Sequence, residues 1–139
     1  MNILEMCDWE AATVPLDATA ERAIRTMLDR RVGAVAVIDD NRRVAGIFTE
    51  RDVLRRLSLG EHDPRKIAVR EVMTAPVEMA TRATTPGEAL ATMVERHYRH
   101  LPIVDDNGQL LGMLSIRNLL QARIDTLTQK LDQVRSVVL

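Results

Sequence analysis

Cysteine and aromatic residues are almost missing from this sequence. Cys7 is the single cysteine among 139 residues, so no disulfide can form within the chain, and a reducing cytosol suits it. One tryptophan, one tyrosine and one phenylalanine are too few to build the stacked aromatic platforms that bind single-stranded nucleic acid. The formal net charge of −1 offers no excess of cations to nucleic acid or to an anionic membrane. The composition therefore predicts a chain that binds neither nucleic acid nor a membrane.

Long apolar runs are also missing. No run approaches the roughly 20 apolar residues that cross a bilayer. The first ten residues lack the layout of a signal peptide. We expect a cytoplasmic protein whose 139 residues form one core, or two small cores that share a face.

Groups that would support catalysis are scarce. The three histidines, His62, His97 and His100, fall in two regions, without cysteine or acidic residues at the spacing of metal ligands. Cys7 has no partner base nearby in the sequence. These absences predict a protein that is not an enzyme and has no catalytic residues, no metal site and no catalytic cofactor.

The most informative stretch, residues 44–52, predicts a strand that runs directly into a helix. Thr49 stands at the expected N-cap, and Asp52 follows three residues later. Both side chains would gather around the unpaired N–H groups at the positive end of the helix, where a phosphate and a sugar hydroxyl could bind. The alternative is a capping arrangement that only starts the helix.

This stretch occurs twice, because residues 112–118 repeat the form of residues 46–52. The offset of 66 residues between Gly46 and Gly112 holds without a gap over residues 19–54. Identical pairs at this offset include Thr19 with Thr85, Met27 with Met93 and Arg51 with Arg117. A period this long, present twice, indicates two copies of one small domain.

Both copies predict the same order of elements. In the first copy, periodicity and turn residues predict a strand at 12–14, a helix at 20–31 capped by Thr19, strands at 34–38 and 44–48, and a helix at 49–58. In the second copy they predict a strand at 77–79, a helix at 86–97, strands at 100–104 and 110–114, and a helix from 115. Residues 59–67 are expected to be a linker. Leu28 and Leu54 are expected on the inward faces of their helices.

The last helix is expected to continue beyond the end of its counterpart in the first copy. Apolar residues at heptad spacing mark this extension: Leu120, Ile124, Leu127, Leu131, Val134 and Val138. We expect this stripe to be a subunit contact that makes a homodimer. The alternative is that it packs on its own domain, against residues 1–9.

The order of these motifs resembles the cystathionine-β-synthase (CBS) domain pair, often called a Bateman module. The resemblance is carried by residues 72–74, 99–105 and 112–118 with their first-copy partners, and it covers residues 10–124. It implies an α+β fold of two β-α-β-β-α repeats packed about a pseudo-twofold axis, here with an extended C-terminal helix. We accordingly divide the chain into three segments: the first repeat with N-terminal segment and linker (1–66), the second repeat (67–124) and the helical extension (125–139).

The resemblance also implies a function in sensing rather than catalysis. Family members usually bind adenosyl compounds in two clefts between the copies. An adenine nucleotide of the AMP, ADP or ATP type is the ligand expected here, most of all AMP or ATP; S-adenosylmethionine or NAD(H) is the alternative. Because the module fills almost the whole chain, it is expected to stand alone and to signal to a separate, unidentified partner protein. A structural dimerisation module without a ligand is the other alternative.

By the same resemblance, each cleft takes residues from both copies. Cleft A is expected to be the tighter site, with Ile47, Thr49, Arg51 and Asp52 facing Val77, Tyr98, Arg99, His100 and Pro102. Cleft B is expected to be weaker or empty, with Met113, Ser115, Arg117 and Asn118 facing Ala11, Val32, Gly33, Ala34 and Ala36.

The two clefts differ in chemistry. Asp52 accepts hydrogen bonds only and can take both ribose hydroxyls, whereas Asn118 has one oxygen and no charge. Arg99 and His100 can meet a phosphate in cleft A, while their counterparts in cleft B are glycine and alanine. The alternative for Arg99 and His100 is an exposed turn between a helix and a strand.

Overall fold

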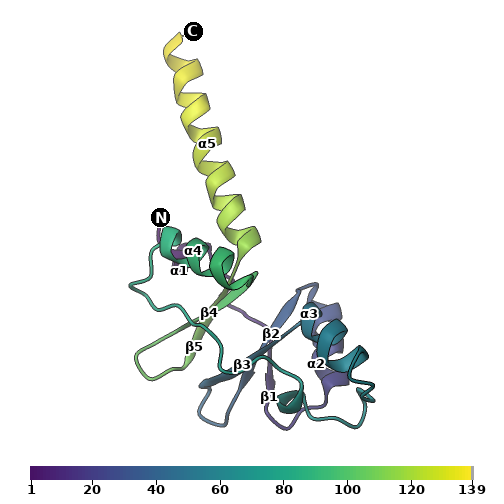
Figure 1. The fold of residues 1–139 in the computed structure, drawn as a ribbon. Coiled ribbons are helices and arrows are strands. Elements are labelled where there is room, and N and C mark those ends of the chain that lie inside the picture. The colour runs from purple at the N-terminus through teal and green to yellow at the C-terminus, as the bar shows by residue number, and fades with distance from the viewer. Residues whose placement is uncertain (139) are drawn as a thin grey trace.

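Each half of the chain forms one small β-sheet with helices packed on it, and helix α5 (Ile116–Val138) extends away from both halves (Figure 1). The computed structural model describes residues 1–138. The other elements are α1 (Ile3–Met6), β1 (Thr13–Pro15), α2 (Ala20–Arg30), β2 (Ala34–Ile38), β3 (Val44–Thr49), α3 (Glu50–Asp52), η1 (Val53–Ser58), η2 (Val69–Glu71), α4 (Pro86–Arg96), β4 (His100–Val104) and β5 (Leu110–Ser115). This order confirms the predicted α+β fold of two repeats with a C-terminal helix. Within residues 1–138, no helix combines the length and apolar character needed to cross a bilayer.

The first sheet forms because residues 34–38 are apolar throughout and are followed by a turn. β1 pairs with β2 in parallel, and β2 pairs with β3 in an antiparallel hairpin. The Asp39 carboxylate closes this hairpin by accepting bonds from the backbone N–H groups of Asn41 and Arg43, both at 2.9 Å. Phe48 is fully buried on the core face of the sheet.

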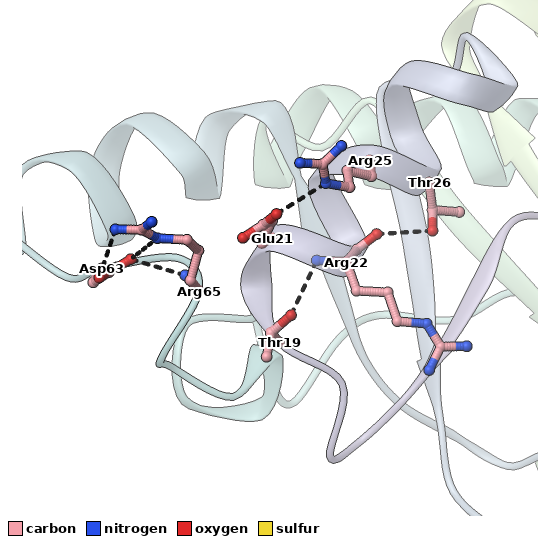
Figure 2. A network of polar contacts seen from close by, with 7 residues as sticks. All are labelled: Thr19, Glu21, Arg22, Arg25, Thr26, Asp63 and Arg65. Atoms are coloured by element: carbon pink, nitrogen blue, oxygen red, sulfur yellow. Dashed lines mark hydrogen bonds and ion pairs between the residues drawn. The ribbon is translucent and has the colours of Figure 1, made fainter.

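Helix α2 begins at its predicted cap. The Thr19 hydroxyl oxygen accepts a bond from the Arg22 N–H at 3.1 Å, and Glu21 pairs with Arg25 one turn later at 2.9 Å (Figure 2). The linker before η2 is ordered next to this helix start, since the Glu21 N–H donates to the Pro64 carbonyl oxygen at 2.9 Å. The predicted linker is therefore folded onto the first repeat.

The predicted inward positions of Leu28 and Leu54 are wrong. Leu28 is 71% exposed and Leu54 is 67% exposed. The buried stripe of α2 runs through Ala23 and Met27, and Leu28 follows it by one residue, or about 100° around the helix. Leu54 lies beside the buried face that ends in Leu57.

The helix predicted at 49–58 forms, but it changes type after Asp52. It continues as the π-helical segment η1, after which the Leu59 N–H donates to the Leu54 carbonyl oxygen at 3.3 Å. The equivalent residues of the second copy, 119–124, stay in the regular α-helix α5. The two copies thus differ one turn after the repeated motif, and π-helical turns often occur at functional sites.

The second sheet has two strands rather than three. β4 and β5 pair antiparallel, and among residues 1–138 only Ala80 bridges to β4 on the other side. In the first copy, the Ala36 N–H donates to the Ala12 carbonyl oxygen at 2.9 Å. Pro102 stands at the position equivalent to Ala36 and has no N–H, so the matching bond cannot form. The strand predicted at 77–79 is therefore wrong.

Each glycine of the repeated motif lies against the backbone of another segment. Thr74 bridges to β3, and Asp8 bridges to β5 at the equivalent place. A Cβ atom at Gly46 would lie 2.8 Å from the Thr74 carbonyl oxygen, and one at Gly112 would lie 2.9 Å from the Asp8 carbonyl oxygen. Both approaches require glycine, and they show that the two copies use the motif in the same way.

The apolar stripe of α5 faces solvent. Its side chains are between 49% and 57% exposed at Leu120, Ile124, Leu127, Leu131 and Val134. The Val138 side chain, the last of the predicted stripe, lies outside the described part of the structure. The N-terminal segment packs instead on a neighbouring face of α5, about 100° around the helix from Leu120, where Leu119 joins Ile3 in the second core. The alternative that the stripe packs on residues 1–9 is therefore wrong.

Candidate functional site

A cavity of about 850 Å³ opens between the repeats, where the start of α3 faces the segment between α4 and β4. Nearly all the residues predicted for cleft A line it: Ile47, Thr49, Arg51, Asp52, Val77, Tyr98, Arg99 and His100. Pro102 is the exception, because its side chain is fully buried within β4. Gly33, which was assigned to cleft B, lines this cavity instead. The name cleft A is kept below for this cavity.

Thr49 and Asp52 form the capping box that their spacing predicts. One Asp52 carboxylate oxygen accepts bonds from the Thr49 N–H at 3.0 Å and the Thr49 hydroxyl at 3.2 Å. The other oxygen accepts a bond from the Thr74 hydroxyl at 2.9 Å and lies 3.5 Å from Arg56 Nε. These contacts hold the side chain of Asp52, a residue that is 5% exposed. A ribose hydroxyl would have to displace Thr74 or Arg56, because each carboxylate oxygen already has two partners.

Arg51 ties the two repeats together at the cavity. Its Nη1 atom donates to the His97 carbonyl oxygen at 2.9 Å. His97 ends α4 in the left-handed conformation, with φ 60°, and turns the chain toward His100. Arg51 therefore orients one wall of cleft A against the other.

His100 lies at the first position of β4, next to Gly33. A Cβ atom at Gly33 would lie 3.4 Å from His100 Cε1 and 3.0 Å from Glu50 Oε1, so a larger residue would crowd both side chains. Burial lowers the pKa of His100, and the neighbouring Arg99 guanidinium lowers this pKa further. An anion in the cavity would have the opposite effect, because it favours the imidazolium form.

We therefore expect anion binding to strengthen on acidification. Sulfate keeps its charge between pH 7.5 and 6, so its stabilisation of the chain in thermal denaturation should grow as His100 takes up a proton. Without an anion, the lowered pKa of His100 has the reverse consequence: the unfolded chain binds the proton first, and stability falls as the pH drops below about 6.5. In His100→Gln, the growth of the sulfate effect should disappear. An identical pH dependence in both proteins would contradict a role for His100 in anion binding.

The residues assigned to cleft B are largely packed against one another. Ser115 and Asn118 repeat the capping pair: Asn118 Oδ1 accepts a bond from the Ser115 N–H at 2.8 Å, and Ser115 Oγ accepts one from the Asn118 N–H at 3.0 Å. Arg117 is exposed. The others fall into two cores, with Ala34, Ala36, Met113 and Ala11 in a small cluster between the sheets and Val32 against the first core. The structure thus separates Gly33 from this group.

Cations are concentrated around cleft A. Its lining includes five arginines, Arg51, Arg55, Arg56, Arg96 and Arg99. The carboxylates of the same lining belong to Glu50 and Asp52. In the other half, the positions equivalent to Arg55, Arg56 and Arg99 hold Gln121, Ala122 and Gly33. The difference in positive charge between the two clefts is therefore larger than Arg99 and His100 alone predict from the sequence.

Sequence reasoning missed several residues of the lining: Glu50, Leu54, Arg55, Arg56, Thr74, Arg96 and His97. A signal existed for Arg55 and Arg56, because they follow Asp52 by three and four residues and so share its helix face. Thr74 and Arg96 reach the cavity through tertiary packing, which spacing along the chain does not report. Among residues 1–138, no group of three or more His, Cys, Asp or Glu side chains is placed to hold a metal ion.

A sequence model of the CBS domain matches residues 5–59 and matches a second time at residues 69–125. The chain belongs to the CBS domain family. An uncharacterised 17.7 kDa protein from Acidianus ambivalens is 37% identical over 129 residues, which are 93% of this chain and 77% of that protein. The chain spans about half or less of the length of several other curated relatives that it matches.

Solved structures of CBS-domain proteins share the fold. A candidate signal-transduction protein with CBS domains from Burkholderia ambifaria MC40-6 has a TM-score of 0.82 at 31% identity, covering 90% of this chain and 95% of its own. The CBS domain protein PAE2072 from Pyrobaculum aerophilum, solved in complex with AMP, has a TM-score of 0.77 at 23% identity, covering 85% of this chain and 89% of its own. At that identity, the second likeness shows the shared fold alone.

Proposed function

We propose that this CBS pair is a regulatory sensor that binds an adenine nucleotide in cleft A. The observation that carries the proposal is the cavity itself, which joins the helix start at Thr49 to Arg99 and His100 of the other repeat. Its volume of about 850 Å³ lies within the range of small-molecule sites, roughly 300–1,000 Å³. The AMP bound to PAE2072, a protein of the same fold, supports an adenosyl ligand.

The lining offers a distinct chemical group to each part of the nucleotide. At the start of α3, the Glu50 N–H already donates to the Gly33 carbonyl oxygen at 3.1 Å and the Asp52 N–H to the Thr49 hydroxyl oxygen at 3.3 Å, so the Arg99 guanidinium is the group that suits a phosphate. The Asp52 carboxylate suits the ribose hydroxyls once Thr74 gives way. Ile47 and Val77 supply apolar surface for the base. Cleft B, built on Ser115 and Asn118, would bind weakly or stay empty.

In this proposal the protein acts by binding rather than by catalysis. It forms a homodimer, works in the cytosol that suits its lone cysteine, and signals to a separate protein. The division into segments 1–66, 67–124 and 125–139 is part of the same proposal. S-adenosylmethionine or NAD(H) is the alternative ligand, and a structural dimerisation module without a ligand is the alternative function.

Thermal denaturation with a panel of AMP, ATP, S-adenosylmethionine and NADH tests the proposal. A ligand present at 100 times its Kd should stabilise the folded chain by about 2.7 kcal/mol. We expect the two nucleotides to do so. A shift with S-adenosylmethionine or NADH alone would replace the ligand, and a flat panel would favour the structural module.

Cleft A should also prefer AMP to adenosine. The helix start at Thr49 and the guanidinium of Arg99 both favour an anion, and adenosine has no phosphate for them to bind. Calorimetry should therefore find AMP at least about tenfold tighter than adenosine, a difference of about 1.4 kcal/mol. The AMP affinity should fall with added salt, since the arginines are exposed. Equal affinities for AMP and adenosine would contradict the assignment of the phosphate.

A further inference from the structure

The five arginines of cleft A differ in what they already contact. Three have partners: Arg51 the carbonyl oxygen of His97 at 2.9 Å, Arg56 the carboxylate of Asp52 at 3.5 Å, and Arg96 the carboxylate of Glu78 at 3.3 Å. Among residues 1–138, Arg55 and Arg99 have neither a side-chain hydrogen bond nor an ion pair, although both line the cavity. Two guanidinium groups are thus available to a ligand without breaking a protein contact.

Arg55 and Arg99 belong to different repeats. Arg55 lies in η1 of the first repeat, and Arg99 lies in the segment just before β4 of the second. Like charges that face one cavity repel each other, and an anion between them relieves that repulsion. The positions equivalent to both arginines in the other half are Gln121 and Gly33, so this pair is specific to cleft A.

Arg55 is also displaced from the expected phosphate position. It follows Thr49 by six residues, which places it more than one turn further along the helix. A single phosphate held at the helix start by Thr49 and Arg99 would leave Arg55 without an anion. A longer phosphate chain that begins at the helix start would extend toward Arg55.

We infer that cleft A prefers a nucleoside di- or triphosphate to a monophosphate, with Arg55 as the residue that reads the additional phosphates. This inference rests on the proposed function, because it concerns the same cavity and the same class of ligand. It narrows the number of phosphates to two or three, which the sequence leaves open. It also gives η1 a function, because that segment carries Arg55 on the lining of cleft A.

Calorimetric titration of the full chain with AMP, ADP and ATP, in the presence of EDTA, tests the inference. ATP should bind about tenfold more tightly than AMP, with ADP between them, because each added charge-assisted contact strengthens binding. In Arg55→Gln, the ATP affinity should fall by more than the AMP affinity, so that the ratio of the two approaches one. Arg123→Gln removes an exposed cation of α5, outside the residues that line cleft A, and should leave the ratio unchanged.

The outcomes separate this inference from the proposed function. AMP that binds as tightly as ATP would overturn the inference and leave the nucleotide sensor standing. An ATP preference that survives in Arg55→Gln would overturn the role of Arg55. If none of the three nucleotides binds, both the inference and the proposed function are wrong.

Discussion

Replacing Asp52 with asparagine should weaken nucleotide binding by about 10- to 100-fold while leaving the chain folded. A hydrogen bond to a charged group is worth roughly 1.5–3 kcal/mol, and each 1.4 kcal/mol is a factor of ten in affinity. Folding should survive, because Asn118 already caps the equivalent helix with its side-chain oxygen, 2.8 Å from the Ser115 nitrogen. Calorimetric titration of the wild type and Asp52→Asn with AMP and ATP measures the effect.

The second copy supplies the matched controls for this prediction. Asn118→Ala should change the affinity of the tight site by much less, because cleft A does not include it. Asn118→Asp should strengthen cleft B only modestly, since no guanidinium stands where Arg99 does in the first cleft. If Asp52→Asn binds like the wild type, Asp52 serves only as a helix cap. If Asn118→Ala loses binding instead, the ligand occupies the other cleft.

Removing residues 125–139 should convert the proposed homodimer to a monomer. The truncation deletes Leu127, Leu131 and Val134, which are about half exposed in the single chain. Fully burying a side chain of this kind contributes about 1.5–3 kcal/mol, so a paired stripe provides several kcal/mol to association. The body should stay folded, because Leu119 remains to pack against Ile3. Light scattering should show the mass of a dimer for the full chain and the mass of a single chain for the truncated protein.

Single substitutions refine the same test. Leu131→Glu places a charge in the stripe and should weaken the dimer, whereas Gln129→Glu lies outside the stripe and should not. A truncated chain that keeps the full dimer mass would reject the role of α5. The dimer would then be formed by apolar side chains that are exposed on the helices of the two repeats, namely Leu28, Leu54, Leu90 and Val94.

The repeat made most of the fold predictable from the sequence. Thr19 and Thr49 cap the helices that they were expected to cap, and the Asp39 turn closes the predicted hairpin. These features depend on neighbours within a few residues, so one sequence is enough to read them. The equivalence of Gly46 and Gly112 was also predictable, because the same motif recurs at a fixed offset.

The errors arose where long-range packing decides the outcome. Pro102 removes the N–H that a third strand of the second sheet would need, and a strand pattern at 77–79 does not reveal its partner. Gly33, which the family resemblance assigns to cleft B, lines cleft A because tertiary packing brings it next to His100 and Glu50. The π-helical segment η1 exposes Leu54 and carries Arg55, and neither effect follows from hydrophobic periodicity. Most of cleft A was thus predictable, and the contribution of Thr74 and Arg96 to its lining was not.

We propose that each chain binds one adenine nucleotide in cleft A. Native mass spectrometry of the full chain, titrated with ATP, tests this because it counts bound molecules. We predict that the chain adds one ATP per protomer, that Asp52→Asn loses most of this adduct and that Asn118→Ala keeps it. A spectrum without any adduct, or one in which two ATP molecules bind each protomer equally well, would contradict the claim.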